Sequence, residues 1–146
     1  MASKHTERFG LCQWEAEDQV LRSDFNADNA KVEAALALCP RIAVGSYEGT
    51  GTYGQANPNS LTFDFAPKLV VITRNAVGSS GQGTVLVGGQ TKSSGIGHSS
   101  SNSLSLYLTW EGNTVSWYTA DVSGGGSASD QFNINGGIYH YCALGL

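Results

Sequence analysis

The stretch SLSLYLTWEGNTVSWYTA, Ser103 to Ala120, decides the fold. Apolar and polar side chains alternate on both sides of Glu111-Gly112-Asn113, and a period of two is the pattern of a half-buried β-strand. The glycine-containing turn between the two runs predicts a β-hairpin. One face would carry the apolar residues Leu104, Leu106, Leu108, Trp110, Val115 and Trp117. The other would carry Ser103, Ser105, Tyr107, Thr109, Ser116 and Tyr118.

Further strand-like runs lie on both sides of this hairpin, separated by turn residues. Including the hairpin, we expect strands at Arg41–Tyr47, Ser60–Phe65, Lys68–Arg74, Gly83–Val87, Ser103–Trp110, Thr114–Ala120, Gln131–Asn135 and Ile138–Leu144. Short strands at this spacing predict a mainly β fold, an antiparallel two-sheet β-sandwich preceded by a short helix. A closed barrel is the alternative topology.

The composition excludes several classes of protein. Charged residues make up 14% of the chain and hydrophobic residues 40%, which is not the composition of a disordered segment. The formal net charge of −4 lacks the basic patch that nucleic acid or an anionic membrane surface requires. No apolar run is long enough to cross a membrane, and the N-terminal residues do not resemble a secretory signal.

The composition changes near Pro40. Residues 1–41 hold 5 of the 8 basic and 7 of the 12 acidic residues, whereas residues 42–146 hold 18 of the 19 glycines. We therefore divide the chain into an attachment or oligomerisation segment, 1–41, and a glycine-rich β domain, 42–146. A helix is expected over about residues 24–38, with Ser23 or Asp24 as its N-cap and Pro40 ending it.

This helix is too short to be stable alone in water and must pack on something. It can fold back on its own β domain, associate with other copies, or dock onto a larger assembly. The last strand looks apolar on both faces, so one face can meet a neighbouring subunit. The predicted interface of a homotrimer comprises Leu21, Phe25, Val32 and Leu36 on the helix, with Tyr139 and Tyr141 on the last strand.

The sequence offers little for catalysis or metal binding. The three cysteines, Cys12, Cys39 and Cys142, form no CxxC pair, and no histidine has metal-ligand spacing. The acidic residues of the β domain form no group, and neither a phosphate-binding loop nor a GxSxG motif is present. We therefore expect no enzyme activity, cofactor or metal.

Two polar loops, Gln90–Asn102 and Asp121–Asp130, are the candidate binding surface. Short hydroxyl side chains beside aromatic rings suit carbohydrate, although such loops can equally be solvated connections. The candidate binding residues are Lys92, His98, Ser100, Asn102, Tyr107, Tyr118 and Asp121.

The stretch FGLCQWEAEDQVLRSDFNADNAKVEAAL, Phe9 to Leu36, resembles the opening of tail proteins from phages and prophages of Gram-positive gut bacteria. Gly45–Asn75 and the ending IYHYCALG, Ile138 to Gly145, resemble a C-terminal module of the same proteins. The F-x-P-K-x-V-x-I pattern of Phe65 to Ile72 and the number of expected strands are also similar to H-type lectin-like sandwiches, which implies a trimer and sugar binding.

The resemblance implies a virion protein, made in the cytoplasm of the bacterial host, that forms part of a tail fibre, tail tip or baseplate appendage. Other tail or baseplate proteins and a host cell-surface glycan would be its partners. The alternatives are a purely structural virion component, a free lectin-like protein and a glycan-cleaving enzyme.

Overall fold

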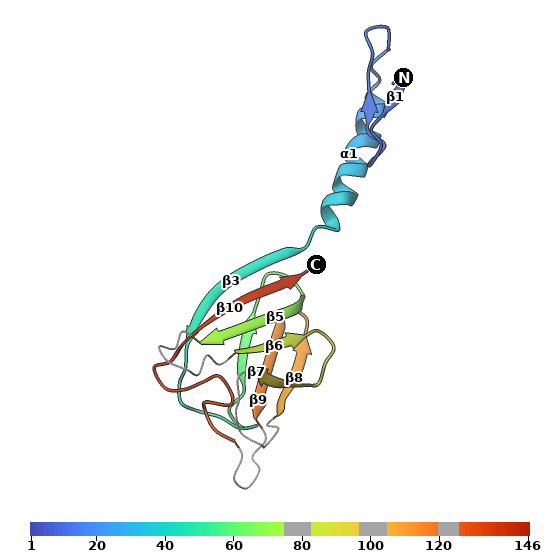
Figure 1. Cartoon of the computed structure of the whole chain (residues 1–146). Helices are drawn as coiled ribbons and strands as arrows, with labels where there is room; N and C mark the ends of the chain where they lie inside the picture. Colours follow the sequence, from blue (N-terminus) through green and yellow to red (C-terminus); the bar gives the residue numbers. More distant parts are fainter. Residues whose placement is uncertain (75–82, 97–104, 120–125) are drawn as a thin grey trace. The chain divides into compact units, whose positions relative to one another are not determined.

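The computed structural model describes residues 1–74, 83–96, 105–119 and 126–146 of the chain (Figure 1). Within these ranges the chain is mainly β, as predicted, with antiparallel strand pairs and one α-helix. The chain divides into two compact units, Met1–Cys39 and Pro40–Leu146, and each has its own internal organisation.

The first unit is a small hairpin that lies against a helix. Strands β1 (Lys4–His5) and β2 (Cys12–Gln13) pair antiparallel, and α1 spans Arg22–Ala37. The backbone N–H of Cys12 donates to the Asp28 carboxylate at 2.7 Å, and the Lys31 ammonium bonds both Asp28 and the Gly10 carbonyl. Polar contacts therefore hold the hairpin to the helix, and the single buried hydrophobic residue described in this unit is Ala2.

The helix begins earlier than the sequence predicted, and the predicted N-cap is wrong. Leu21, with extended backbone angles of φ −108° and ψ 141°, occupies the N-cap and makes no side-chain capping bond. Asp24 lies inside the first turn, where its carboxylate accepts a hydrogen bond from the N–H of Ala2 at 3.2 Å. The Asp24 carboxylate is thus used for a tertiary contact with Ala2 and not for a local capping bond.

The second unit is built on an eight-stranded sheet in the order β3-β10-β5-β6-β7-β8-β9-β4. Each neighbouring pair is antiparallel. The strands are β3 (Arg41–Glu48), β4 (Asn59–Thr62), β5 (Pro67–Arg74), β6 (Gly83–Val87), β7 (Lys92–Ile96), β8 (Ser105–Glu111), β9 (Thr114–Thr119) and β10 (Ile138–Gly145).

One hydrophobic core joins the two halves of this sheet. Val70, Ile72 and Leu86 come from β5 and β6, whereas Val115 and Trp117 come from β9, and all five belong to the same buried cluster. Phe63 and Phe65, which follow β4, complete it. Because burial of these side chains stabilises the unit, β5, β6, β8, β9 and β10 each have one face fixed toward the core and the other turned away from it.

Two parts of the second unit differ from the sequence prediction. The expected strand Gln131–Asn135 is wrong: the segment forms turns, and Phe132 has a positive φ of 59°. The side-chain amides of this segment form hydrogen bonds with an adjacent loop, as described below, and the segment pairs with no neighbouring strand. Conversely, β7 lies inside the stretch 90–102 that was expected to be a loop.

Close approach of the backbone explains one of the glycines. The N–H of Gly49 donates to the carbonyl of Gly137 at 2.8 Å, and a Cβ at Gly49 would overlap the carbonyl oxygen of Ile134. A larger residue at position 49 would therefore separate the end of β3 from the turn that precedes β10.

Candidate functional site

The outer face of β8 and β9 is polar because their inner face is committed to the core. Leu106, Leu108, Val115 and Trp117 are buried, so the residues between them point outward. Strand register sets the outward residues in cross-strand pairs, Tyr107 with Tyr118, Thr109 with Ser116, and Glu111 with Thr114. The sequence predicted this division of the hairpin into two faces, and the described residues confirm it.

Two stacked tyrosines form the aromatic part of this face. The rings of Tyr107 and Tyr118 lie 5.3 Å apart between centroids and are inclined by 12°. Lys92, which pairs with Tyr107 across β7 and β8, places its ammonium 4.8 Å from the centre of the Tyr107 ring. A cation at this distance is attracted to the ring face and limits its movement. We name these three residues the tyrosine shelf.

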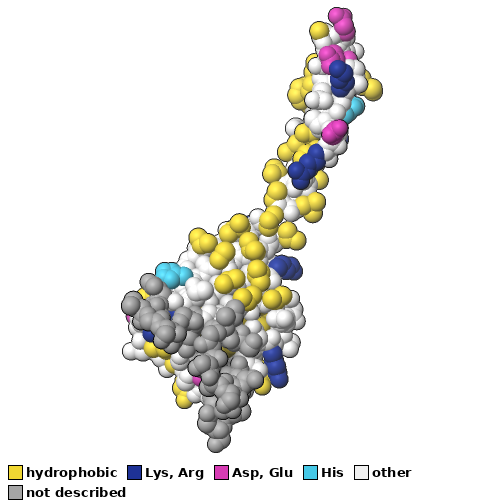
Figure 2. Space-filling model, viewed as in Figure 1, with side chains coloured by type: hydrophobic (Ala, Val, Ile, Leu, Met, Phe, Trp, Pro, Cys, Tyr) yellow, Lys and Arg dark blue, Asp and Glu magenta, His cyan; other side chains and the backbone are white. Residues whose placement is uncertain are grey.

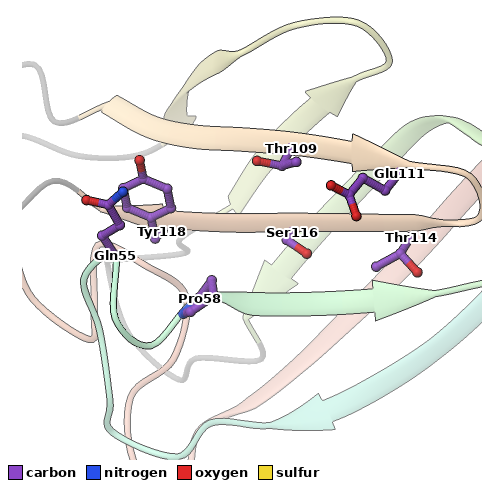
Figure 3. A pocket seen from close by; sticks show the side chains of 7 residues that line it. All are labelled: Gln55, Pro58, Thr109, Glu111, Thr114, Ser116 and Tyr118. Carbon is purple, nitrogen blue, oxygen red and sulfur yellow. The ribbon is translucent and has the colours of Figure 1, made fainter.

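A shallow pocket with a volume of about 220 Å³ adjoins the shelf (Figure 3). It is lined by Gln55, Pro58, Thr109, Glu111, Thr114, Ser116 and Tyr118. Figure 3 shows Gln55 beside the Tyr118 ring, with Thr109, Ser116, Glu111 and Thr114 continuing along the two strands. The hydroxyls of Thr62 and Thr114 are 2.8 Å apart, so hydroxyl groups extend the polar surface onto β4.

A buried glutamine holds the loop that supplies Gln55 and Pro58. The side-chain oxygen of Gln131 accepts hydrogen bonds from the N–H of Gly54 at 2.8 Å and from that of Thr119 at 3.0 Å. Its amide nitrogen donates to the carbonyl of Asn57 at 2.7 Å. Gln131 is fully buried and so connects β9 to both ends of this loop segment. The pocket wall is therefore fixed from inside the unit.

A second buried amide, that of Asn133, fixes the start of the same loop. Its oxygen accepts from the N–H of Thr50 at 2.9 Å, and its nitrogen donates to the carbonyl of Thr52 at 2.8 Å. The phenol of Tyr47 donates to the carbonyl of Phe132 at 2.8 Å, and burial raises the pKa of this phenol well above its ordinary value. Sequence reasoning missed this network, because alternation in Gln131–Asn135 looks like that of a strand.

The structure brings together three of the predicted binding residues, namely Lys92, Tyr107 and Tyr118. The other four, His98, Ser100, Asn102 and Asp121, lie outside the described residues. The pocket adds residues that sequence reasoning did not single out as binding residues: Gln55, Pro58, Thr109, Glu111, Thr114 and Ser116. Alternation had placed Thr109 and Ser116 beside the tyrosines, but no local signal pointed to Gln55 or Pro58.

The predicted interface residues of α1 lie on the surface of the first unit. Phe25, Val32 and Leu36 are 49%, 42% and 64% exposed, and Leu21 is partly buried. The ring of Phe25 stacks on Trp14 with centroids 5.0 Å apart. The indole N–H of Trp14 is buried without a hydrogen-bond partner. The helix therefore keeps an apolar stripe available for contact.

The predicted interface role of Tyr139 on β10 is wrong. Tyr139 is fully buried, stacks on Tyr47 with centroids 5.1 Å apart, and accepts a hydrogen bond from the N–H of Ile134. Tyr141 shares this inner face, packs edge-on against Phe63 and is partly buried, so it too faces the core. Both faces of β10 are apolar, and the larger aromatic side chains fill the core. The outward face carries Ile138, His140, Cys142 and Leu144 instead.

Among the described residues, no group of three or more His, Cys, Asp or Glu side chains is placed to hold a metal ion. In the same part of the chain, no helix is long and apolar enough to span a bilayer. The three cysteines are free thiols.

Comparisons with protein-family models, with curated proteins and with solved structures found no match to this chain.

Proposed function

We propose that this chain is a bacteriophage tail protein whose β domain binds carbohydrate on the host cell surface. The observation that carries the proposal is the tyrosine shelf, which borders a pocket lined by hydroxyl, amide and carboxylate groups. The resemblance of the N-terminal segment to phage tail proteins supports a place in a tail fibre, a tail tip or a baseplate appendage.

The chemistry of the face suits a sugar. Pyranose rings present C–H groups that pack on the faces of aromatic rings. Tyr107 lies between Lys92 and Tyr118, so the ring of Tyr118, which lines the pocket, is the surface on which a sugar can stack. The hydroxyls of Thr109, Thr114 and Ser116 can each donate and accept, as sugar hydroxyls do, and Glu111 can accept. A volume of about 220 Å³ is below the roughly 300–1,000 Å³ of pockets that enclose a small molecule. The pocket therefore suits one or two residues of an extended glycan chain.

We assign the β domain to the two-sheet sandwich class. Support comes from the shared core, because β5, β6 and β10 as well as β8 and β9 contribute side chains to one buried cluster. In the described residues the sheet order ends at β3 and β4, and these two strands are not paired with each other, which favours a sandwich over a closed barrel. Such a sandwich leaves the outer surfaces of both halves accessible for recognition.

A purely structural role on the particle is the second candidate. The exposed stripe of Phe25, Val32 and Leu36 supports it, because exposed apolar side chains on a helix indicate contact with further copies or with other tail proteins. We assign this stripe to the homotrimer. Under this second candidate the tyrosine shelf would have no ligand.

Binding of the labelled full-length chain to intact Gram-positive gut bacteria tests the proposal. We expect saturable binding that is lost when surface glycan is chemically stripped from the same cells. A folded protein that binds neither cells nor released surface polysaccharide would overturn the carbohydrate proposal in favour of the structural role.

A further inference from the structure

Glu111 supplies the one charge among the described residues that line the pocket. Figure 3 shows Glu111 and Thr114 at one end of this pocket, with Tyr118 and Gln55 at the other. A carboxylate only accepts hydrogen bonds, whereas a hydroxyl both donates and accepts. A sugar that stacks on Tyr118 and extends along the strands therefore meets a negatively charged acceptor at the far end of the pocket.

The polar groups nearest to Glu111 on this face are neutral. Register pairs Glu111 with Thr114, and it sets Ser60 and Thr62 of β4 opposite Ser116 and Thr114. Residues directly opposite each other in an antiparallel pair lie on the same face, so hydroxyl groups of β9 and β4 share this face with the carboxylate. A hydroxyl can donate to the carboxylate but leaves its charge in place. The face as a whole therefore stays negative at this end.

The cations near this face are engaged elsewhere. Among the described residues Glu111 forms no ion pair. Lys92 holds its ammonium over the Tyr107 ring, and Tyr107 lies four residues from Glu111 along β8, about 14 Å at roughly 3.4 Å per residue. Salt at physiological concentration largely screens charges beyond about 8 Å. Arg41 is paired with Asp64. The Glu111 carboxylate is therefore available to a cationic group of a ligand.

A free carboxylate on a face of hydroxyl groups selects ligands by charge. It attracts a protonated amine and repels a carboxylate or a phosphate. We infer that the sugar in the pocket is an amino sugar whose amine is free, and that Glu111 is the residue that selects it. This inference rests on the carbohydrate-binding proposal and narrows it to one class of glycan. Because Glu111 is exposed, water screens the attraction, and we expect a preference of about fivefold.

N-acetylation of the ligand tests the inference. Acetylation of free amines converts each ammonium to a neutral amide and leaves the sugar ring in place. The full-length chain is titrated by calorimetry with surface polysaccharide released from Gram-positive gut bacteria, before and after this treatment. We expect acetylation to weaken binding to the wild-type chain about fivefold and to leave binding to Glu111→Gln unchanged. The matched control is Glu48→Gln on β3, which removes an exposed carboxylate outside the pocket and should respond as the wild type does.

The outcomes separate this inference from the proposal on which it rests. Equal wild-type affinity for the two polysaccharides would overturn the amino-sugar assignment and leave carbohydrate binding intact. A loss on acetylation that persists in Glu111→Gln would do the same. Absence of binding to either polysaccharide would overturn both.

Defined monosaccharides give a second readout. Nuclear magnetic resonance of the labelled chain compares D-glucosamine, N-acetyl-D-glucosamine and D-glucuronic acid at about pH 6, where the amine is protonated. We expect glucosamine to give the largest shift changes at Thr109, Glu111 and Ser116. Its advantage should decrease in about 1 M NaCl, where the Debye length is about 3 Å. Glucosamine changes that do not exceed those of the other two sugars would overturn the inference.

Discussion

Gln131 is the residue on which the shape of the candidate site depends most. Its buried amide satisfies the backbone N–H groups of Gly54 and Thr119 and also the carbonyl of Asn57. Buried polar groups of this kind cost little when paired and much when a partner is removed. The pocket wall and the end of β9 therefore depend on the same side chain.

Replacing this amide should destabilise the β domain. Gln131→Leu leaves two buried N–H groups unpaired, and at about 1–3 kcal/mol for each we expect a loss of roughly 2–6 kcal/mol in the free energy of unfolding. Urea denaturation followed by tryptophan fluorescence measures it. The control Gln90→Leu, at an exposed position, should change this free energy by less than about 0.5 kcal/mol. Equal effects of the two substitutions would contradict the role of Gln131.

Tyr118 is the residue shared by the shelf and the pocket. We expect Tyr118→Ala to weaken binding to released surface polysaccharide at least about tenfold, which corresponds to about 1.4 kcal/mol. Calorimetry of wild type and variant provides the comparison. Phe9→Ala, which removes an exposed aromatic ring from the first unit, is the control and should bind as the wild type does. Unimpaired binding by Tyr118→Ala would show that the ligand does not contact the tyrosine shelf.

Two carboxylates make the first unit sensitive to acid. The backbone N–H groups of Glu15 and Ser3 lower the pKa of Asp18. Desolvation opposes ionisation of Asp28, but hydrogen bonds from the Cys12 N–H and from Lys31 outweigh it and lower the pKa of this carboxyl too. A lowered folded-state pKa contributes stability above the unfolded value of about 3.9, and that stability is lost as the pH falls through the folded value.

The helix signal in circular dichroism should report this loss. We expect ellipticity at 222 nm to be constant from pH 7 to about pH 5 and to decrease as the pH falls below about 4. Asp28→Asn should reduce the signal at pH 7 and flatten the acid transition, because the amide cannot carry the charge that Lys31 and the Cys12 N–H stabilise. Identical pH profiles for the two proteins would show that Asp28 does not hold the hairpin.

At the scale of elements, most of the correct predictions rest on the alternation of apolar and polar residues along strands. The hairpin of β8 and β9 has apolar and polar residues in strict alternation, so both its position and its two faces followed from the sequence. In β10 both faces are apolar, and alternation cannot tell which one is inside. The prediction therefore placed Tyr139 at an interface, although the size of its ring fits the core.

Elements that depend on distant contacts could not be predicted locally. The sequence of β7, KSSGI, shows no apolar alternation, and its pairing with β6 and β8 defines it as a strand. Gln131–Asn135 alternates like a strand, yet its amides bond residues about 70 to 80 positions earlier in the chain. The place of Gln55 and Pro58 in the pocket could not be predicted for the same reason, because Gln131 positions the loop that carries them.

At the scale of the whole β domain, the two halves of the sheet expose opposite chemistry. The half with β3, β10, β5 and β6 exposes the apolar side chains of Ile42, Val44 and Val87, and the half with β8, β9 and β4 presents hydroxyls and tyrosines (Figure 2). Val44 is exposed in the first half and lines no part of the candidate site. We therefore expect Val44→Asp to leave the affinity for polysaccharide within about twofold of the wild type; a larger loss would indicate ligand contacts outside the tyrosine shelf and its pocket.

The most direct test of the carbohydrate proposal is to map where the ligand lies. Nuclear magnetic resonance of the isotope-labelled chain, titrated with oligosaccharide released from the host surface, reports this residue by residue. The proposal predicts saturable shift changes centred on Lys92, Tyr107, Thr109, Ser116 and Tyr118, with Val44 and Leu144 unaffected. Saturable changes confined to β3 and β10 or to the first unit, with the signals of the tyrosine shelf unchanged, would contradict it.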